Sequence, residues 1–132
     1  LKFKAESLKL GENVIFTVPV NYQDLPLYLK ISDVFVRPSQ SEGLGSAFLE
    51  AMAAGMPIIG TKVGGIPDFL EDRKTGLFCS NEPEDIAFKI RIIFENDKLR
   101  QELISSARAL VAEKYNWNKI ALEFGQLYKS IL

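Results

Sequence analysis

Residues 33–60 read DVFVRPSQSEGLGSAFLEAMAAGMPIIG, and this stretch decides the fold. It contains two short apolar runs, 34–36 and 58–60, with the length and β-branched content of buried strands. Between them, the apolar segment 47–54 reads as a helix that is buried on most sides and ends at Gly55. A strand, a helix and a strand in this order are typical of parallel strands joined by a crossover helix. The sequence therefore predicts an α/β fold with a parallel sheet.

The flanking segments continue the same alternation of strands and helices. Two further apolar runs, 14–18 and 76–79, are predicted to be strands. Between the first of these and residue 34, Asp24 is placed to cap a helix. Pro26 then falls in the first turn of that helix, where its missing N–H has no intrahelical partner.

The chain becomes helical after residue 83. Helices are predicted to begin at Pro83, at Asp97 and near Asn116, and Asn81 and Glu84 have the spacing of a capping box for the first of them. The third helix carries an apolar stripe, and aromatic residues at helical spacing are usually core. The stripe consists of Trp117, Ile120, Ala121, Phe124, Tyr128 and Ile131. We expect one domain, 1–132, in which the carboxyl-terminal helices form a cap.

The composition is that of one ordinary globular domain of 132 residues, 47% of them hydrophobic and 25% charged. A net charge of −1 does not provide the basic surface that nucleic-acid binding uses. The chain contains no histidine, which removes ordinary serine and cysteine triads and the commonest zinc ligand. The single cysteine, Cys79, excludes an intrachain disulfide, suits a reducing compartment and is expected to be a small core residue.

Two features concern the location and completeness of the chain. No run of about 18 apolar residues occurs, and no charged and then apolar leader opens the chain. The sequence therefore predicts neither a spanning helix nor a signal peptide, and we expect a cytoplasmic protein. The chain begins with Leu1, and residues 1–13 read as the tail of a helix, so we also expect a piece of a longer protein.

The turn after the strand at 34–36 has the features of a phosphate site. Gly43 and Gly45 allow close backbone approach, and the N-terminus of the following helix presents free N–H groups. Glu42 lies in the turn, and Glu50 lies one turn inside the helix with its side chain leaning back toward the N-terminus. The two carboxylates would flank one small volume and accept hydrogen bonds from hydroxyl groups. A nucleotide sugar, with phosphates and hydroxyls, would satisfy both kinds of group.

Other interpretations of this turn stand beside that one. On spacing alone, Glu50 capping nearby backbone amides and Glu42 lying in solvent carry equal weight. A metal site has little support, because the two glutamates have neither a histidine nor a nearby aspartate beside them. A dinucleotide fingerprint fails, since Phe48 stands where the third glycine is needed, and no Gly-Lys-Ser or Gly-Lys-Thr of a P-loop occurs.

Six blocks in register, from about Leu10 onward, resemble the carboxyl-terminal domain of the retaining glycosyltransferases with the GT-B fold. The central block holds Glu42 and Glu50, two glutamates separated by seven residues, which is the signature of that family. This central block covers 33–59, and the five blocks after it are 63–67, 75–77, 83–87, 115–117 and 127–128. The resemblance implies half of a GT-B fold, which is a Rossmann-like parallel sheet with flanking helices and a helical carboxyl-terminal cap.

The resemblance also implies a role for each matching residue. Glu42, the catalytic residue, would accept from hydroxyls of the transferred sugar, Glu50 would accept from the ribose, and Val20 would touch the base through its backbone. The turn that would hold the sugar and diphosphate contains Gly43, Leu44, Gly45, Ser46 and Ala47. The substrate would be a UDP- or GDP-linked sugar, with no cofactor and no metal. The diphosphate would leave with both electrons while the acceptor hydroxyl attacks the same face, so the anomeric configuration is retained.

The chain departs from the family pattern in several places. Two strand units are missing, including one that supplies an Arg and a Lys to the diphosphate, and the amino-terminal acceptor domain is also missing. Val18 replaces a glycine common near the base. We expect the missing strands to leave a gap, so that the fragment either repacks or self-associates.

These departures shape the expected function. A longer parent would transfer sugar to a carbohydrate or glycolipid acceptor in polysaccharide or glycolipid assembly, in the cytoplasm or peripherally at the inner membrane surface. This chain alone would transfer little. The competing interpretation is a non-catalytic module that binds nucleotide sugars or a partner. An epimerase of the same fold is disfavoured, because such enzymes usually depend on histidine, which is absent.

Overall fold

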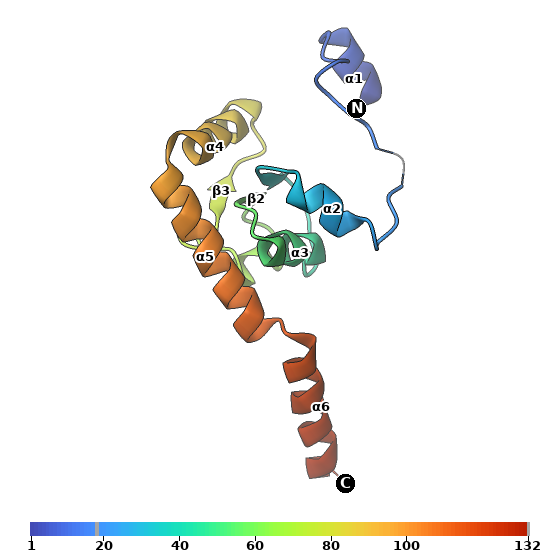
Figure 1. Ribbon diagram of the computed structural model, residues 1–132, viewed down its shortest axis with the longest axis vertical. Coiled ribbons are helices and arrows are strands. Elements are labelled where there is room, and N and C mark those ends of the chain that lie inside the picture. Colours follow the sequence, from blue (N-terminus) through green and yellow to red (C-terminus); the bar gives the residue numbers. More distant parts are fainter. Residues whose placement is uncertain (18, 132) are drawn as a thin grey trace.

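The computed structural model describes residues 1–17 and 19–131, and it places a three-stranded parallel sheet at the centre (Figure 1). The strands are β1 (Phe35–Arg37), β2 (Ile58–Thr61) and β3 (Leu77–Cys79), in the order β1-β2-β3. Arg37 pairs with Gly60, and Thr61 pairs with Cys79. Three of the four predicted strands are therefore confirmed.

Helices surround this sheet and extend from it at both ends of the chain (Figure 1). They are α1 (Lys2–Ser7), α2 (Leu25–Lys30), α3 (Ser46–Ala54), the short 3-10 helix η1 (Ile66–Asp68), α4 (Pro83–Glu95), α5 (Asp97–Lys114) and α6 (Trp117–Ile131). The long helix α5 packs across both α3 and α4. The helices predicted near Asp24, over 47–54, and from Pro83, Asp97 and Asn116 are confirmed and begin within a residue or two of the predicted positions. The helical segment predicted over 1–13 is shorter, since α1 ends at Ser7.

The core occupies both faces of the sheet, as a parallel sheet requires. All four residues of β2 are buried, and Ile58 and Ile59 point to opposite faces, because side chains alternate along a strand. Ile58 packs on the α3 side, around Phe48, while Ile59 packs with Ile93 on the α4 side. Cys79 is buried as predicted, and burial raises the pKa of its thiol.

Phe48 fixes the position of α3 on the sheet. Its ring is fully buried and lies 5.1 Å from the ring of Phe35 and 5.8 Å from that of Phe69, measured between centroids. Gly60 leaves room for this ring, since a Cβ there would lie 2.8 Å from a ring carbon of Phe48. The start of α3 is thus anchored to the strands on either side of it.

The predicted strand at 14–18 is wrong over its described part. Residues 14–17 form no strand and are largely exposed, and Ile15 is 88% exposed. A strand is stable only beside another strand, and β2 is the only described strand that pairs with β1. Val18, including its replacement of a glycine, lies outside the described residues.

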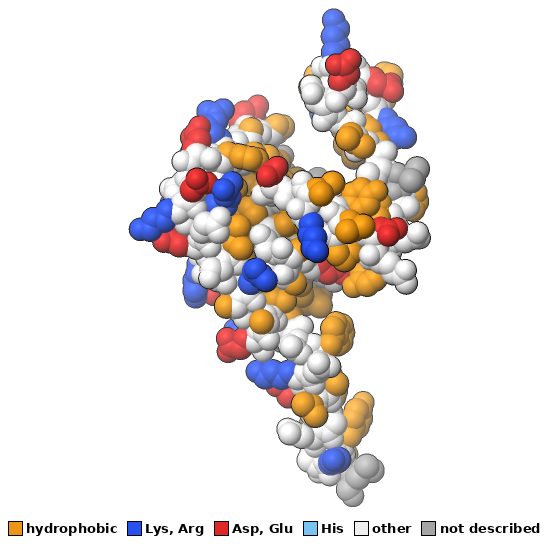
Figure 2. Space-filling model, viewed as in Figure 1, with side chains coloured by type: hydrophobic (Ala, Val, Ile, Leu, Met, Phe, Trp, Pro, Cys, Tyr) orange, Lys and Arg blue, Asp and Glu red, His pale blue; other side chains and the backbone are white. Residues whose placement is uncertain are grey.

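The predicted core stripe on the last helix is also wrong. No described residue of α6 is buried, and Trp117, Phe124 and Tyr128 are 81%, 55% and 64% exposed. The helix extends away from the sheet, and orange side chains line one edge of it in Figure 2. Periodicity identified the helix, but an apolar face is buried only when another surface covers it.

Two predicted helix caps differ from the observed ones. Asp24 precedes α2 but accepts no capping hydrogen bond through its side chain. Asn81 and Glu84 form no capping box at α4, where the N-cap is Glu82. Instead the Asp85 carboxylate accepts from the Ser80 N–H, with 2.6 Å between Oδ2 and N. This hydrogen bond holds the pKa of Asp85 below its ordinary value of 3.8.

The Asp85 contact predicts a pH-dependent part of the stability. Because the pKa of Asp85 is lowered by folding, its contribution is present above pH 3.8 and is lost as the pH falls through the folded value. Asp85→Asn keeps an acceptor oxygen but cannot titrate. We expect its thermal midpoint to fall less than that of the wild-type chain between neutral pH and pH about 2. An equal fall in both proteins would show that this contact does not contribute.

Candidate functional site

The candidate site lies at the carboxyl ends of β1 and β2, where ligands of open α/β sheets bind. Arg37 is the last residue of β1 and Thr61 the last residue of β2. The turn from residue 38 to Gly45 leaves β1 here and leads into α3. The sheet therefore brings this turn beside the loop that follows β2.

The N-terminus of α3 has no side-chain cap. Its N-cap is Gly45, in the left-handed conformation with φ +74°, and no side chain accepts a capping hydrogen bond there. The Phe48 N–H donates to the Gly45 carbonyl over 2.9 Å, which leaves the N–H groups of Ser46 and Ala47 as the first-turn donors without an intrahelical acceptor. Leu44, just before the cap, is 57% exposed. The arrangement leaves amide donors and the positive end of a helix dipole for an acceptor.

Gly64 and Gly65 support this turn. They belong to the matching block 63–67, to which the sequence alone assigned no role. The Gly65 N–H donates to the Gly43 carbonyl, with 3.0 Å between N and O. A Cβ on Gly65 would lie 2.6 Å from the same oxygen, and a Cβ on Gly64 would overlap the carbonyl oxygen of Glu42. Gly64 also adopts a positive φ of 53°. Only glycine suits such close backbone contact, so this pair sets where Glu42 stands.

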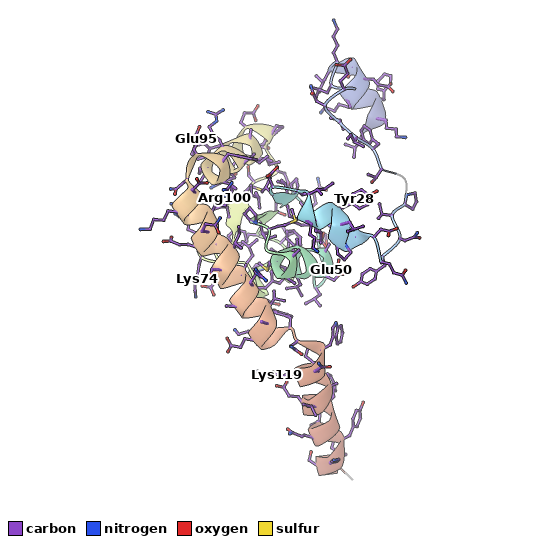
Figure 3. The ribbon with its side chains drawn as sticks, viewed as in Figure 1. Tyr28, Glu50, Lys74, Glu95, Arg100 and Lys119 are labelled. Carbon is purple, nitrogen blue, oxygen red and sulfur yellow. The ribbon has the colours of Figure 1, made fainter. Side chains whose placement is uncertain are left out.

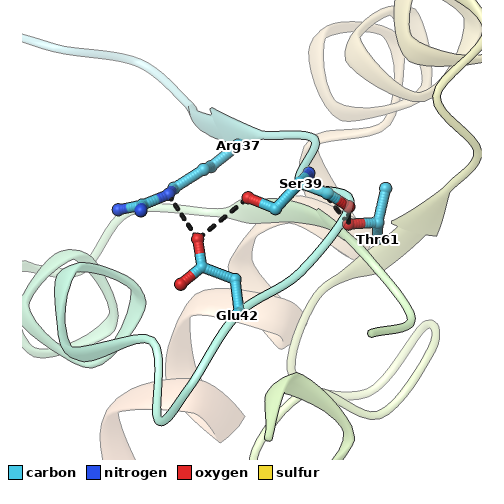
Figure 4. Close-up of polar contacts among 4 residues, drawn as sticks. All are labelled: Arg37, Ser39, Glu42 and Thr61. Carbon is cyan, nitrogen blue, oxygen red and sulfur yellow. Dashed lines mark hydrogen bonds and ion pairs between the residues drawn. The ribbon is translucent and has the colours of Figure 1, made fainter. Parts of the chain in front are cut away.

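The Glu42 carboxylate is held by two neighbours (Figure 4). Its side chain is only 11% exposed, and its Oε1 lies 2.8 Å from Nε of Arg37 in an ion pair. The Ser39 hydroxyl donates to the same Oε1 over 2.9 Å. Thr61 in turn fixes Ser39, accepting from its N–H at 3.0 Å and donating to its carbonyl at 2.6 Å. Sequence reasoning missed the Arg37 contact, which joins residues five apart across a turn.

Glu50 projects from α3 (Figure 3). It lines two cavities that share three residues. It is half-buried, and its carboxylate accepts from the Tyr22 hydroxyl at 3.4 Å. The expected burial of this helix on most sides is corrected here, because Ala53 and Ala54 are exposed and form cavity wall. Glu50 therefore interrupts the apolar pattern on an open face, within reach of a ligand.

The two cavities share Tyr22, Glu50 and Ala53. The first, of about 290 Å³, is otherwise lined by Leu25, Pro26, Leu29 and Ala54. The second, of about 330 Å³, is otherwise lined by Leu44, Ser46, Leu49, Val111, Tyr115, Trp117 and Ile120. Burial raises the pKa of the Tyr115 phenol, with a further contribution from Asp68.

The structure brings only part of the predicted site together. Leu44, Ser46 and Glu50 line the second cavity. The other predicted residues, Glu42, Gly43, Gly45, Ala47 and Val20, line neither cavity. Neither of these two cavities is therefore a volume that both glutamates flank, and the Glu42 carboxylate is held by Arg37 and Ser39 instead.

Two aromatic side chains line the cavities. Tyr22 reaches Glu50 from the loop before α2 and was missed by sequence reasoning. Trp117, at the start of α6, was predicted to be a core residue and instead lines the second cavity. The only sequence signal of Tyr22 was its aromatic character, and that of Trp117 was its place in the apolar stripe. Such a signal does not say which surface a side chain faces.

The described part of the chain contains neither a cluster of metal-ligating side chains nor a membrane-spanning helix. Within residues 1–17 and 19–131, no group of three acidic or cysteine side chains could hold a metal ion. No helix in the same residues is both long and apolar enough to cross a bilayer.

Comparison with known proteins identifies the family. Residues 1–110 match the family described as glycosyl transferases group 1. The chain belongs to this family. It is 38% identical to sulfoquinovosyl transferase SQD2 of Arabidopsis thaliana over 116 residues, which is 85% of this chain and 22% of that protein. This chain therefore spans less than a quarter of the sulfoquinovosyl transferase.

Solved structures agree on the fold. Sucrose-phosphate synthase from Thermosynechococcus elongatus is 30% identical and superposes with a TM-score of 0.91 over 98% of this chain and 33% of its own. HepE of Anabaena in complex with UDP-glucose is 22% identical, with a TM-score of 0.89 over 98% of this chain and 35% of its own, and shows the fold alone. These proteins are GT-B glycosyltransferases, which confirms the predicted Rossmann-like α/β fold. The present chain spans about a third of the length of each of these two proteins.

The close contact between the loop after β2 and the turn after β1 predicts how a methyl group at Gly64 changes the stability. Gly64→Ala places a Cβ against the carbonyl of Glu42 at a positive φ. We expect it to lower the free energy of unfolding by about 2 kcal/mol or more, measured by urea titration. Gly43→Ala is the matched control, since a Cβ there meets nothing within 4 Å, and it should change stability by less than about 0.5 kcal/mol. Equal losses would contradict the account of the turn.

Proposed function

We propose that this chain is the donor-binding part of a retaining glycosyltransferase, which binds a nucleoside diphosphate sugar for transfer to an acceptor hydroxyl. The observation that carries the proposal is the placement of Glu50. This carboxylate faces two cavities beside an uncapped helix N-terminus. Family membership is consistent with that use of the site.

Each group at the site suits one part of such a donor. The first-turn N–H groups of α3, at Ser46 and Ala47, would donate hydrogen bonds to the negatively charged diphosphate oxygens. Glu50 would exchange its long 3.4 Å contact with Tyr22 for hydrogen bonds from the ribose hydroxyls at ordinary distance, and a short bond to an ionised carboxylate is stronger than a long one. The base would lie toward Val20, which is half-buried in the loop before Tyr22. Glu42 would accept from the transferred sugar.

The transfer itself would separate charge at the anomeric carbon. The bond from that carbon to the diphosphate breaks, and the electron pair leaves with the diphosphate. The acceptor oxygen forms its bond on the same face, and its proton passes to the leaving diphosphate. Amide donors fixed beside the leaving group stabilise the charge that develops there. The proposal assigns no step to a cofactor or a metal ion.

In this proposal a longer parent protein would supply the acceptor-binding part. The chain spans 22% of the sulfoquinovosyl transferase and 33% of the sucrose-phosphate synthase, so we assign acceptor binding and transfer to a parent protein. UDP is the first candidate nucleotide, because HepE holds UDP or UDP-glucose in its structures, and GDP is the second. We further propose a carbohydrate or glycolipid acceptor, and a cytoplasmic site of action, peripheral at the inner membrane surface.

A second candidate function is a module that keeps the fold without catalysis. The contact between Arg37 and Glu42 favours it, because a carboxylate paired to an arginine is less free to bind sugar hydroxyls. The two functions differ in what Glu42 does. A catalytic parent would lose its activity on Glu42→Ala, whereas a binding module would be unaffected.

Nucleotide binding by the chain tests the proposal. Titration calorimetry with UDP and GDP should show saturable binding of one of them. Glu50→Gln should weaken it by about tenfold or more, because the ribose loses a charged acceptor. Glu95→Gln, at an exposed glutamate on the far side of the sheet at the end of α4, is the matched control and should bind as the wild-type chain does (Figure 3). Equal affinity in all three proteins would contradict the ribose role.

A further inference from the structure

We propose that Arg37 is the positioning residue for Glu42, holding one oxygen of the carboxylate so that the other is presented to the sugar of the donor. The proposal rests on the proposed function, because it takes the donor to be a nucleotide sugar. Arg37 lies at the end of β1, and nothing in the glutamate pair itself points to it. Its contact with Glu42 comes from the fold of the turn.

Both neighbours of Glu42 contact the same oxygen atom. The Arg37 guanidinium and the Ser39 hydroxyl meet Oε1, at 2.8 Å and 2.9 Å. Among residues 1–17 and 19–131 we find no hydrogen bond to Oε2, and Figure 4 shows this oxygen turned away from both neighbours. An ionised carboxylate accepts through both oxygens, so half of its capacity is left for a ligand.

Burial explains why the carboxylate needs this arrangement. The Glu42 side chain is 11% exposed, and a charge removed from water must be paired. Arg37 provides the opposite charge and is itself 47% exposed, so its position depends on the pair more than on packing. Ser39 is the rigid member, because its backbone is bound at both ends by the hydroxyl of buried Thr61. Charge and rigidity together fix the direction of Oε2.

The opposite role for Arg37 would be to block the site. If the ion pair kept Glu42 from the ligand, removing Arg37 would free the carboxylate and tighten binding of the sugar. If Arg37 positions Glu42, removing it would let the carboxylate turn and would weaken that binding. The two roles therefore differ in the sign of one measured change.

The test compares a nucleotide with and without its sugar. The dissociation constant of UDP divided by that of UDP-glucose measures the contribution of the sugar, and GDP with GDP-mannose gives a second such ratio. In the wild-type chain we expect one of these ratios to exceed one. Arg37→Met should reduce that ratio by about fivefold or to one, while the affinity for the nucleotide alone stays within about twofold.

Three further variants separate positioning from loss of structure. Glu42→Gln should abolish the sugar contribution, and the double variant Arg37→Met, Glu42→Gln should lose no more than Glu42→Gln alone. Ser39→Ala removes the second contact and should lower the ratio without touching Arg37. Arg91→Met, at an exposed arginine on α4, is the matched control and should leave the ratio unchanged. Thermal melting should show that every variant used is folded.

Each outcome decides something. A higher ratio in Arg37→Met, or an unchanged one, overturns the positioning role. A wild-type ratio of one or less with good nucleotide binding also overturns it, while the donor-binding proposal stands. Failure of the folded wild-type chain to bind UDP, GDP or their sugars overturns the proposed function itself. A parallel loss of nucleotide affinity in Arg37→Met would assign Arg37 a structural role instead.

Discussion

The candidate site depends on the close backbone contact between two loops at the carboxyl ends of β1 and β2. Gly64 and Gly65 allow the second loop to touch the carbonyls of Glu42 and Gly43, and no side chain fits between them. This contact sets the path of the turn into α3. The uncapped N-terminus of α3 and the position of Glu50 follow from that path, together with the anchoring of Phe48 in the core. The site is therefore built from backbone geometry before any ligand-binding side chain is considered.

The sequence predicted the parts of the fold that are set locally. The unit from β1 through α3 to β2 was recognisable because its apolar runs, its glycines and its helix length act within about thirty residues. The helices α4 and α5 were predicted for the same reason. The predicted positions of Leu44, Ser46 and Glu50 around one cavity also follow from a strand, a turn and a helix in sequence order.

The parts that could not be predicted depend on contacts that leave no periodic pattern in the sequence. Residues 14–17 have the composition of a strand, but no described strand lies beside them. The apolar face of α6 is largely exposed, and none of its described residues is buried. Glu42 was expected to face Glu50, and the ion pair with Arg37 was missed because charge pairing across a turn leaves no periodic pattern. For residues 14–17 and for α6 the local pattern was correct, and the neighbouring surface decided the outcome. For Glu42 a contact five residues away in the same turn decided it.

The central claim is that the N-terminus of α3 and Glu50 form the binding site of a nucleoside diphosphate. The most direct measurement is the change in backbone amide NMR signals of the ¹⁵N-labelled chain on adding UDP, and separately GDP. The account predicts that the largest changes fall on residues 44–47, on Glu50 and on Tyr22 in the loop that reaches it. Saturable changes confined to other surfaces, or no changes with either nucleotide, would contradict it.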